Sequence, residues 1–194
     1  MKTIVWDVDD VLNDLMRDWF SNGWLPSHPN CAVTYDNLSE NPPHRVIGIG
    51  LGEYLASLDD FRLAQGARLQ PLPNVHHWFQ VYGRHFRHIT LSAVPLGTAD
   101  ISAAWVLKYY GQWIRSFNVI PSSREQENAL VYDRTKKDFL QWWCKADIIV
   151  DDNSVTIAAA QELGIKTMLI PRPWNKSQKT VSDILKDLAR LSSE

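Results

Sequence analysis

Residues 2–12 read Lys2-Thr3-Ile4-Val5-Trp6-Asp7-Val8-Asp9-Asp10-Val11-Leu12, a short apolar strand that leads directly into acidic residues. Asp7 and Asp9 are two positions apart, and side chains at that spacing point to the same side of an extended chain. We therefore expect the two carboxylates to converge at the C-terminal end of the first strand.

A second acidic pair follows the same pattern late in the chain, where the apolar segment 147–150 leads into Asp151 and Asp152. Four carboxylates that share one site repel one another unless a cation lies between them, and oxygen ligands of this kind suit a divalent metal. The two acidic pairs together are typical of a metal-dependent enzyme that acts on an anion.

Short apolar segments alternate with helical ones along most of the chain, which predicts an α/β fold with a parallel sheet and helices on both faces. The predicted strands are Ile4–Asp7, His85–Leu91, either Phe117–Ile120 or Leu130–Tyr132, Asp147–Val150, and Lys166–Ile170. The predicted helices are Val75–Tyr82, Thr98–Arg115, Lys136–Lys145, Ser154–Leu163 and Thr180–Leu191.

One stretch does not fit this alternation. Residues 14–72 hold several prolines and glycines and only short helical pieces, Leu15–Phe20 and Gly52–Leu58. We interpret them as a small helical cap inserted directly after the first strand. Residues 1–13 and 73–194 then form the core domain, with Pro71 and Pro73 at the second boundary.

The order of these motifs resembles the haloacid dehalogenase-like superfamily of hydrolases. The matching residues are Asp7, Asp9, Ser92, a lysine at 136 or 137, and the pair Asp151-Asp152. The segment Asp7–Asp14 and the Pro173-Trp174-Asn175 turn are closer still to the 5'(3')-deoxyribonucleotidase branch. Asp10 stands where that family commonly has glycine. The resemblance implies a Rossmann-like core with a cap and phosphatase activity.

The residue types suit phosphoryl transfer, which needs a nucleophile, charge neutralisation and a proton donor. Asp7 is the predicted nucleophile, forming an aspartyl phosphate, and Asp9 the predicted acid and base. The resemblance implies that Mg²⁺ is held by Asp7, by the backbone carbonyl of Asp9 and by one acid of the late pair, with Asp152 favoured over Asp151.

Phosphate binding is assigned to Ser92 at the end of its strand, to the backbone of Ala93, and to a lysine. Lys136 and Lys137 both stand at the start of a predicted helix, where a cation is unfavourable for the helix dipole. We favour Lys136, because Phe139 and Leu140 lie three and four residues beyond it and anchor the helix.

The overall composition narrows the class of protein. A formal charge of −2 gives no case for a nucleic acid polymer or an anionic membrane surface as partner. No apolar run approaches the roughly 18 residues of a membrane span, and the N-terminus lacks the features of a signal peptide, so a cytoplasmic protein is expected. The two cysteines, Cys31 and Cys144, are far apart and are expected to be reduced thiols.

The expected substrate is a small phosphorylated metabolite, with a 5'-nucleoside monophosphate as the first choice. Aromatic residues of the cap such as Trp19 and Trp24 could stack a nucleobase, although a small insertion also needs large rings for its own core. The alternatives are a phosphatase of sugar or other metabolite phosphates, a phospho-acceptor signalling domain, and a binding domain without catalysis.

Overall fold

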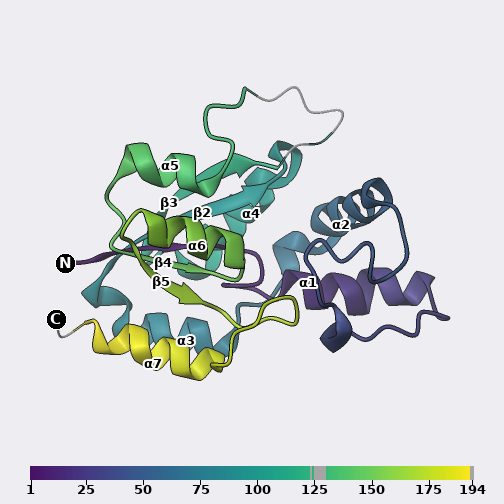
Figure 1. Cartoon of the computed structure of the whole chain (residues 1–194), viewed down its shortest axis with the longest axis horizontal. Coiled ribbons are helices and arrows are strands. Elements are labelled where there is room, and N and C mark those ends of the chain that lie inside the picture. Colours follow the sequence, from purple (N-terminus) through teal and green to yellow (C-terminus); the bar gives the residue numbers. More distant parts are fainter. Residues whose placement is uncertain (123, 125–129, 193–194) are drawn as a thin grey trace.

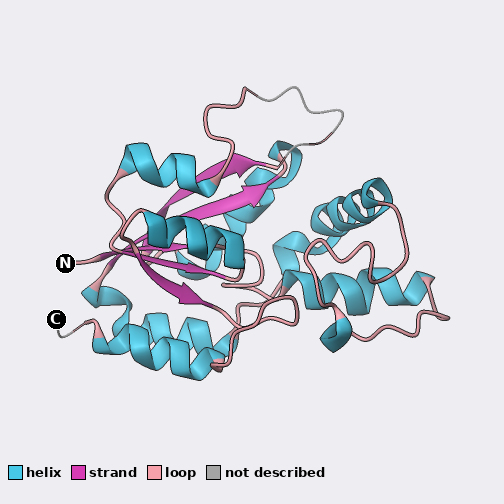
Figure 2. Cartoon of the chain, viewed as in Figure 1, coloured by secondary structure: helices cyan, strands magenta, loops and turns pink. Residues whose placement is uncertain are grey.

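The computed structural model describes residues 1–122, 124 and 130–192. Its centre is a five-stranded parallel sheet with the strand order β3-β2-β1-β4-β5 (Figures 1 and 2). The strands are β1 (Thr3–Trp6), β2 (Arg87–Val94), β3 (Ile114–Pro121), β4 (Ile148–Asp151) and β5 (Lys166–Leu169). The predicted α/β class is confirmed.

The register of the sheet decides which side chains meet at its carboxyl edge. Trp6 of β1 lies opposite Thr90 of β2 on one side and Val150 of β4 on the other. Asp7 and Asp151 follow Trp6 and Val150 directly, so they emerge side by side. The two acidic motifs, some 140 positions apart in sequence, are therefore neighbours in space.

Helices cover both faces of the sheet (Figure 1). One face carries α5 (Lys136–Trp143) and α6 (Ser154–Glu162), and the other carries α3 (Pro73–Tyr82), α4 (Leu96–Tyr110) and α7 (Val181–Arg190). Side chains of the central strands alternate between the two cores, with Val5 and Ile149 on the α5 side and Trp6 and Val150 on the other.

Most element boundaries differ from the prediction by one to three residues, and the differences are most informative in β2 and α4. The second strand extends to Val94, so Ser92 lies within the strand and does not close it. Helix α4 begins at Leu96 and ends at Tyr110, with Gly111 as its C-cap, whereas the sequence pattern predicts a helix over Thr98–Arg115. Glycine commonly ends helices, and this was the signal that the apolar periodicity obscured.

The third strand had two candidates. Phe117–Ile120 lies within β3. The other candidate, Leu130–Tyr132, is exposed irregular chain and joins no sheet. Part of the connection between β3 and α5 falls outside the described residues.

The chain between β1 and α3 lies to one side of the sheet (Figure 1). It contains α1 (Leu15–Asp18), which continues as a π-helical turn over Trp19–Trp24, and α2 (Leu51–Gln65), which is longer than the predicted Gly52–Leu58. We call residues 14–72 the cap, as the sequence proposes. Its aromatic rings pack mainly on one another, with Trp19 against Phe20, Trp24 and Tyr54.

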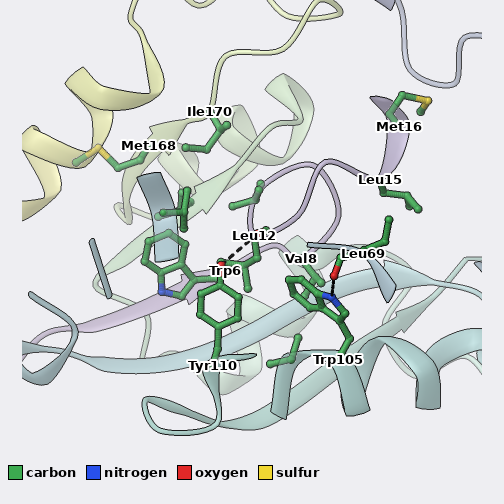
Figure 3. Close-up of a cluster of buried hydrophobic side chains, with 14 of the residues drawn as sticks. Trp6, Val8, Leu12, Leu15, Met16, Leu69, Trp105, Tyr110, Met168 and Ile170 are labelled. Carbon is green, nitrogen blue, oxygen red and sulfur yellow. Dashed lines mark hydrogen bonds between the residues drawn. The ribbon is translucent and has the colours of Figure 1, made fainter. Parts of the chain in front are cut away.

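The two ends of the cap meet at one place, which we call the cap root. The Leu72 backbone N–H donates to the Leu12 carbonyl at 2.9 Å, and the Tyr110 hydroxyl donates to the same carbonyl at 3.2 Å. The Trp105 indole N–H donates to the Leu69 carbonyl at 2.8 Å (Figure 3). Helix α4 of the core therefore fixes both chains that enter and leave the cap.

A buried histidine joins the sheet to α3. The indole N–H of Trp6 donates to Nδ1 of His88 at 3.0 Å, so the ring proton lies on Nε2, which is 2.7 Å from the Gly83 carbonyl. The contact with Trp6 requires the neutral ring, because Nδ1 must accept a hydrogen bond. Burial lowers the pKa of His88 to about 4.

Within the described residues, none of the helices has the length and apolar character needed to span a bilayer.

Candidate active site

A cavity of about 550 Å³ lies at the carboxyl edge of the sheet, between the core and the cap. Its lining includes most of the residues predicted from sequence, namely Asp7, Asp9, Ser92, Ala93, Lys136 and Asp152. Ligand sites of open α/β sheets form at this edge. Ser92 is buried on β2, two residues beyond the Thr90 that pairs with Trp6.

Three carboxylates form a cluster at the cavity, which we call the floor; Asp7 and Asp152 line the cavity, whereas Asp151 is buried and does not. Asp7, Asp151 and Asp152 each offer one oxygen, and these oxygens lie within 4.8 Å of one another. Asp151 and Asp152 are almost completely buried. The arrangement follows from the register, because β1 and β4 are adjacent and end at the same level.

Lys136 is the lysine that the fold brings to this site. Its Nζ lies 2.9 Å from Oδ1 of Asp7 and 2.7 Å from Oδ2 of Asp151. The side chain of Thr135 accepts a hydrogen bond from the backbone N–H of Asp138 and so caps the N-terminus of α5. The helix therefore begins at Lys136. The alternative, Lys137, also lines the cavity but pairs with Glu162 on α6.

The carboxyl groups and the lysine of the floor have shifted pKa values, because they are buried close together. Burial, with smaller effects of Asp151 and Asp152, raises the pKa of Asp7 well above its usual range, although Lys136 opposes this. Burial and the neighbouring Asp151 raise the pKa of Asp152 to about 8. Burial alone would lower the pKa of Lys136, but Asp151 and Asp7 outweigh it and raise that pKa.

These residues fit a divalent cation. When all three carboxyls are ionised, they exceed the one ammonium group by two negative charges in a buried space. Oxygen ligands are those that Mg²⁺ and similar hard cations prefer. A cation here would offset both the burial and the smaller carboxylate repulsion that raise the pKa of Asp7 and Asp152.

Asp9 lines the same cavity, but its carboxylate is not one of the three in the cluster. Strand β1 ends at Trp6 and the chain then turns, so the alternation expected from the i, i+2 spacing does not continue. Oδ2 of Asp9 accepts a hydrogen bond from Nη2 of Arg62 at 3.0 Å, and Oδ1 accepts one from Nδ2 of Asn13 at 3.1 Å.

Arg62 was not predicted as a site residue. It comes from α2 of the cap, is buried, and pairs with Asp59 at 3.1 Å as well as with Asp9. Asp59 in turn accepts two hydrogen bonds from the guanidinium of Arg124, which follows β3. This ion chain connects the core to the cap. The i, i+3 spacing of Asp59 and Arg62 was visible in sequence, but usually indicates a solvated helix face.

The turn after β5, residues 170–175, donates hydrogen bonds to residues of both acidic motifs. Nε of Arg172 donates to the carbonyl of Asp10 at 2.7 Å. The indole N–H of Trp174 donates to Oδ2 of Asp152 at 2.6 Å, and Nδ2 of Asn175 donates to the Asp152 carbonyl at 2.8 Å. In the sequence, this turn is recognisable only as a family resemblance and not as a support for the acidic residues.

The proposed base-stacking role of Trp19 and Trp24 does not suit their positions. Both rings are buried, at 0% and 3% exposure, and neither lines the cavity. Among the described residues that line the cavity, the aromatic one is Tyr54, beside Leu55 and Leu58 of α2. The rings at 19 and 24 therefore serve the core of the cap.

A larger hollow, about 960 Å³, lies at the opposite edge of the sheet, where the strands begin. Several exposed cations line it, including Arg84 and Lys145 just beyond the ends of α3 and α5. Helix C-termini favour nearby cations, which explains these residues without a ligand. The carboxylate cluster lies at the other edge.

Comparison with known proteins identifies the fold. No protein-family model matches the chain, and no curated protein matches it in sequence. Among solved structures, a haloacid dehalogenase-like family hydrolase from Streptococcus pneumoniae matches with a TM-score of 0.58 and 14% identity, over 96% of this chain and 90% of that one.

Two further structures are similar over almost their whole length. A predicted phosphatase from Clostridium acetobutylicum has a TM-score of 0.62 at 10% identity, covering 97% of this chain and 98% of that one. Protein Tyrosine Kinase A from Mycobacterium tuberculosis has a TM-score of 0.61 at 14% identity, covering 97% of each chain. This chain therefore has the fold of the haloacid dehalogenase-like hydrolases, and the resemblance seen in sequence is confirmed for the fold.

Proposed function

We propose that the protein is a Mg²⁺-dependent phosphohydrolase that cleaves a small phosphomonoester through an aspartyl-phosphate intermediate. The carrying observation is that Asp7, Asp152 and Lys136 line one cavity and that the buried Asp151 lies in contact with Lys136 beside them. The fold alone does not decide the activity, because the similar structures include both a predicted phosphatase and a protein described as a kinase.

In the first step, a carboxylate oxygen of Asp7 attacks phosphorus, and the bond between phosphorus and the ester oxygen breaks. The leaving alkoxide takes its proton from Asp9, on the cap side of the cavity. In the second step, Asp9 takes a proton from water, which attacks phosphorus and releases inorganic phosphate and the Asp7 carboxylate.

Arg62 matters for this cycle, because it pairs with the carboxylate of Asp9. Asp9 must be ionised to take a proton from water in the second step. The first step requires the protonated form, so the mechanism implies that the contact between Arg62 and Asp9 loosens when substrate enters.

The remaining residues neutralise the phosphoryl group. Lys136 is placed to contact phosphate oxygens beside Asp7, and Ser92 with the backbone of Ala93 borders the same space. Asp7, Asp152 and the carbonyl of Asp9 would hold Mg²⁺, with Asp151 in support. Bound there, the cation supplies positive charge to the phosphoryl oxygens.

For the substrate we retain a 5'-nucleoside monophosphate as first choice. The cavity volume suits a metabolite of that size, and Tyr54, Leu55 and Leu58 give it an apolar wall on the cap side. The same wall accepts other phosphate esters, so a sugar or other metabolite phosphate is the second candidate. A cytoplasmic location also stays a prediction.

The test is phosphate release by the purified protein from a panel of 5'-nucleoside monophosphates, sugar phosphates and an aryl phosphate, each with Mg²⁺ and with chelator. We expect turnover only with Mg²⁺, and fastest turnover on nucleotides. Sugar phosphates as the best substrates would overturn the nucleotidase assignment alone. A stable phosphoprotein without turnover would instead indicate a phospho-acceptor domain.

A further inference from the structure

The three carboxylates of the floor are not held in the same way. Lys136 contacts both Asp7 and Asp151, and backbone N–H groups of Val8 and Asn153 donate to those two carboxylates as well. Within the described part of the chain, the carboxylate of Asp152 has one hydrogen-bond donor, the indole N–H of Trp174.

This difference matters for binding a cation. An ammonium group that pairs with a carboxylate also cancels its charge, whereas a neutral indole N–H fixes the carboxylate and leaves its charge in place. Of the three, Asp152 is therefore the carboxylate that a neutral donor orients, while Lys136 pairs with the other two. Trp174 lies outside the cavity lining, so it acts on Asp152 from behind and not on substrate.

The indole is itself held by the cap. The ring of Tyr35 meets the ring of Trp174 edge to face, with centroids 6.2 Å apart. The guanidinium of Arg17 lies 3.9 Å over the centre of the Tyr35 ring. Tyr35 is buried and its hydroxyl has no hydrogen-bond partner among the described residues, so the ring is what it contributes.

We propose that Trp174 is the positioning residue of the cation site, orienting Asp152 through its N–H, and that Tyr35 of the cap braces its ring. The proposal rests on the proposed function only in taking Asp152 as a cation ligand. It makes the affinity for the cation depend on a turn and a cap residue that contact neither the cation nor the substrate.

The test is a calorimetric titration of the protein with Mg²⁺ alone. Trp174→Phe keeps an aromatic ring and removes the donor, and we expect it to weaken Mg²⁺ binding by about 10-fold or more, the usual effect of removing a partner of a metal ligand. Trp142→Phe is the matched control, because the Trp142 indole also donates to a carboxylate, that of Asp133, at 3.0 Å on the surface. It should bind Mg²⁺ as the wild type does.

A second variant covers the case in which phenylalanine disturbs the turn. Replacing Trp174 by benzothienylalanine, in which sulfur takes the place of the N–H, preserves the shape of the ring and should weaken Mg²⁺ binding to the same degree. Tyr35→Ala should weaken binding by a smaller factor, and Tyr35→Phe should leave it unchanged. In phosphatase assays, the Trp174 variants should need a higher Mg²⁺ concentration for activation. Their rate at saturating Mg²⁺ should be close to that of the wild type.

Unchanged Mg²⁺ affinity in both Trp174 variants would overturn the inference and leave the proposed function standing. A wild-type protein that binds Mg²⁺ but hydrolyses no phosphate ester would overturn the proposed function and leave the inference standing. A wild-type protein that binds no Mg²⁺ would overturn both.

Discussion

Asp7 carries more of the proposed chemistry than any other residue, since it is both the predicted nucleophile and a neighbour of the two late aspartates. We expect Asp7→Asn to lower the rate of phosphate release by at least about 10³-fold, because the amide has nearly the same shape but cannot supply an anionic nucleophile. Steady-state assays with an aryl phosphate would measure this. Near wild-type turnover in a correctly folded variant would contradict the covalent mechanism.

Asp10 has a backbone conformation that is uncommon for residues other than glycine. Its φ is +62°, in the left-handed region that glycine adopts freely and that aspartate and asparagine tolerate better than most residues. The side chain compensates, because Oδ1 accepts a hydrogen bond from the Met16 backbone N–H at 2.9 Å.

Substitutions at this position should therefore separate backbone from side-chain effects. Asp10→Ala loses the acceptor and keeps the unfavourable φ, so we expect it to lower the free energy of unfolding by about 2 kcal/mol. Asp10→Asn keeps the acceptor and should change that free energy by less than about 1 kcal/mol. Urea denaturation of both variants measures the difference, and equal losses would contradict this account.

At the scale of helices and strands, the sequence predicted an element well where its apolar periodicity agreed with the residues that commonly start or end such elements. The strands at β1, β4 and β5 and the capped helix α7 lie close to their predicted bounds. Boundaries were predicted wrongly where the two signals conflicted. At Gly111 the apolar pattern continues, although glycine commonly ends a helix, and α4 ends there. The length of α2 was underestimated for a related reason, because its mixed surface has little periodicity to detect.

Because His88 is buried between the sheet and α3, the free energy of unfolding should depend on pH. Its pKa of about 4 in the folded protein lies below the ordinary 6.5, so the unfolded chain binds more protons between those two values. The free energy of unfolding should therefore fall as the pH is lowered from 6.5 to 4, by on the order of 3 kcal/mol from this residue.

Denaturation curves of the wild type and of His88→Gln at pH 7 and pH 4.5 would check this. Glutamine does not titrate, so the variant should lose less stability on acidification than the wild type. Equal losses would mean that the buried ring is not responsible.

At the scale of the whole molecule, the candidate site consists of residues that the sequence could predict and residues that it could not. Asp7, Lys136, Asp151 and Asp152 could be foreseen, because each stands next to a strand or helix end that a parallel sheet brings to one edge. Arg62, Asp59 and Trp174 could not be, since their roles depend on how the cap and the last turn fold back over that edge. Periodicity predicts which face of an element is buried, but not which distant element covers it.

Cation binding should be visible in the stability of the whole chain. Mg²⁺ relieves the repulsion among Asp7, Asp151 and Asp152 only in the folded protein, so it should raise the melting temperature. At about 100 times its dissociation constant the gain is about 2.7 kcal/mol, or roughly 5–10 °C for a chain of this size. Thermal melts with Mg²⁺ and with chelator measure it, and Asp152→Asn should show a smaller rise. No rise in the wild type would contradict a cation site.

The cap root has a consequence for how such a protein can change over evolutionary time. The two chains that cross between core and cap are joined by one hydrogen bond, from Leu72 to Leu12, and both are tethered to α4. An insertion of another length or sequence could start and finish at the same two points without moving the strand that carries Asp7. Selectivity for new compounds can then be acquired by exchanging a single segment, while the chemistry at the sheet edge is inherited unaltered.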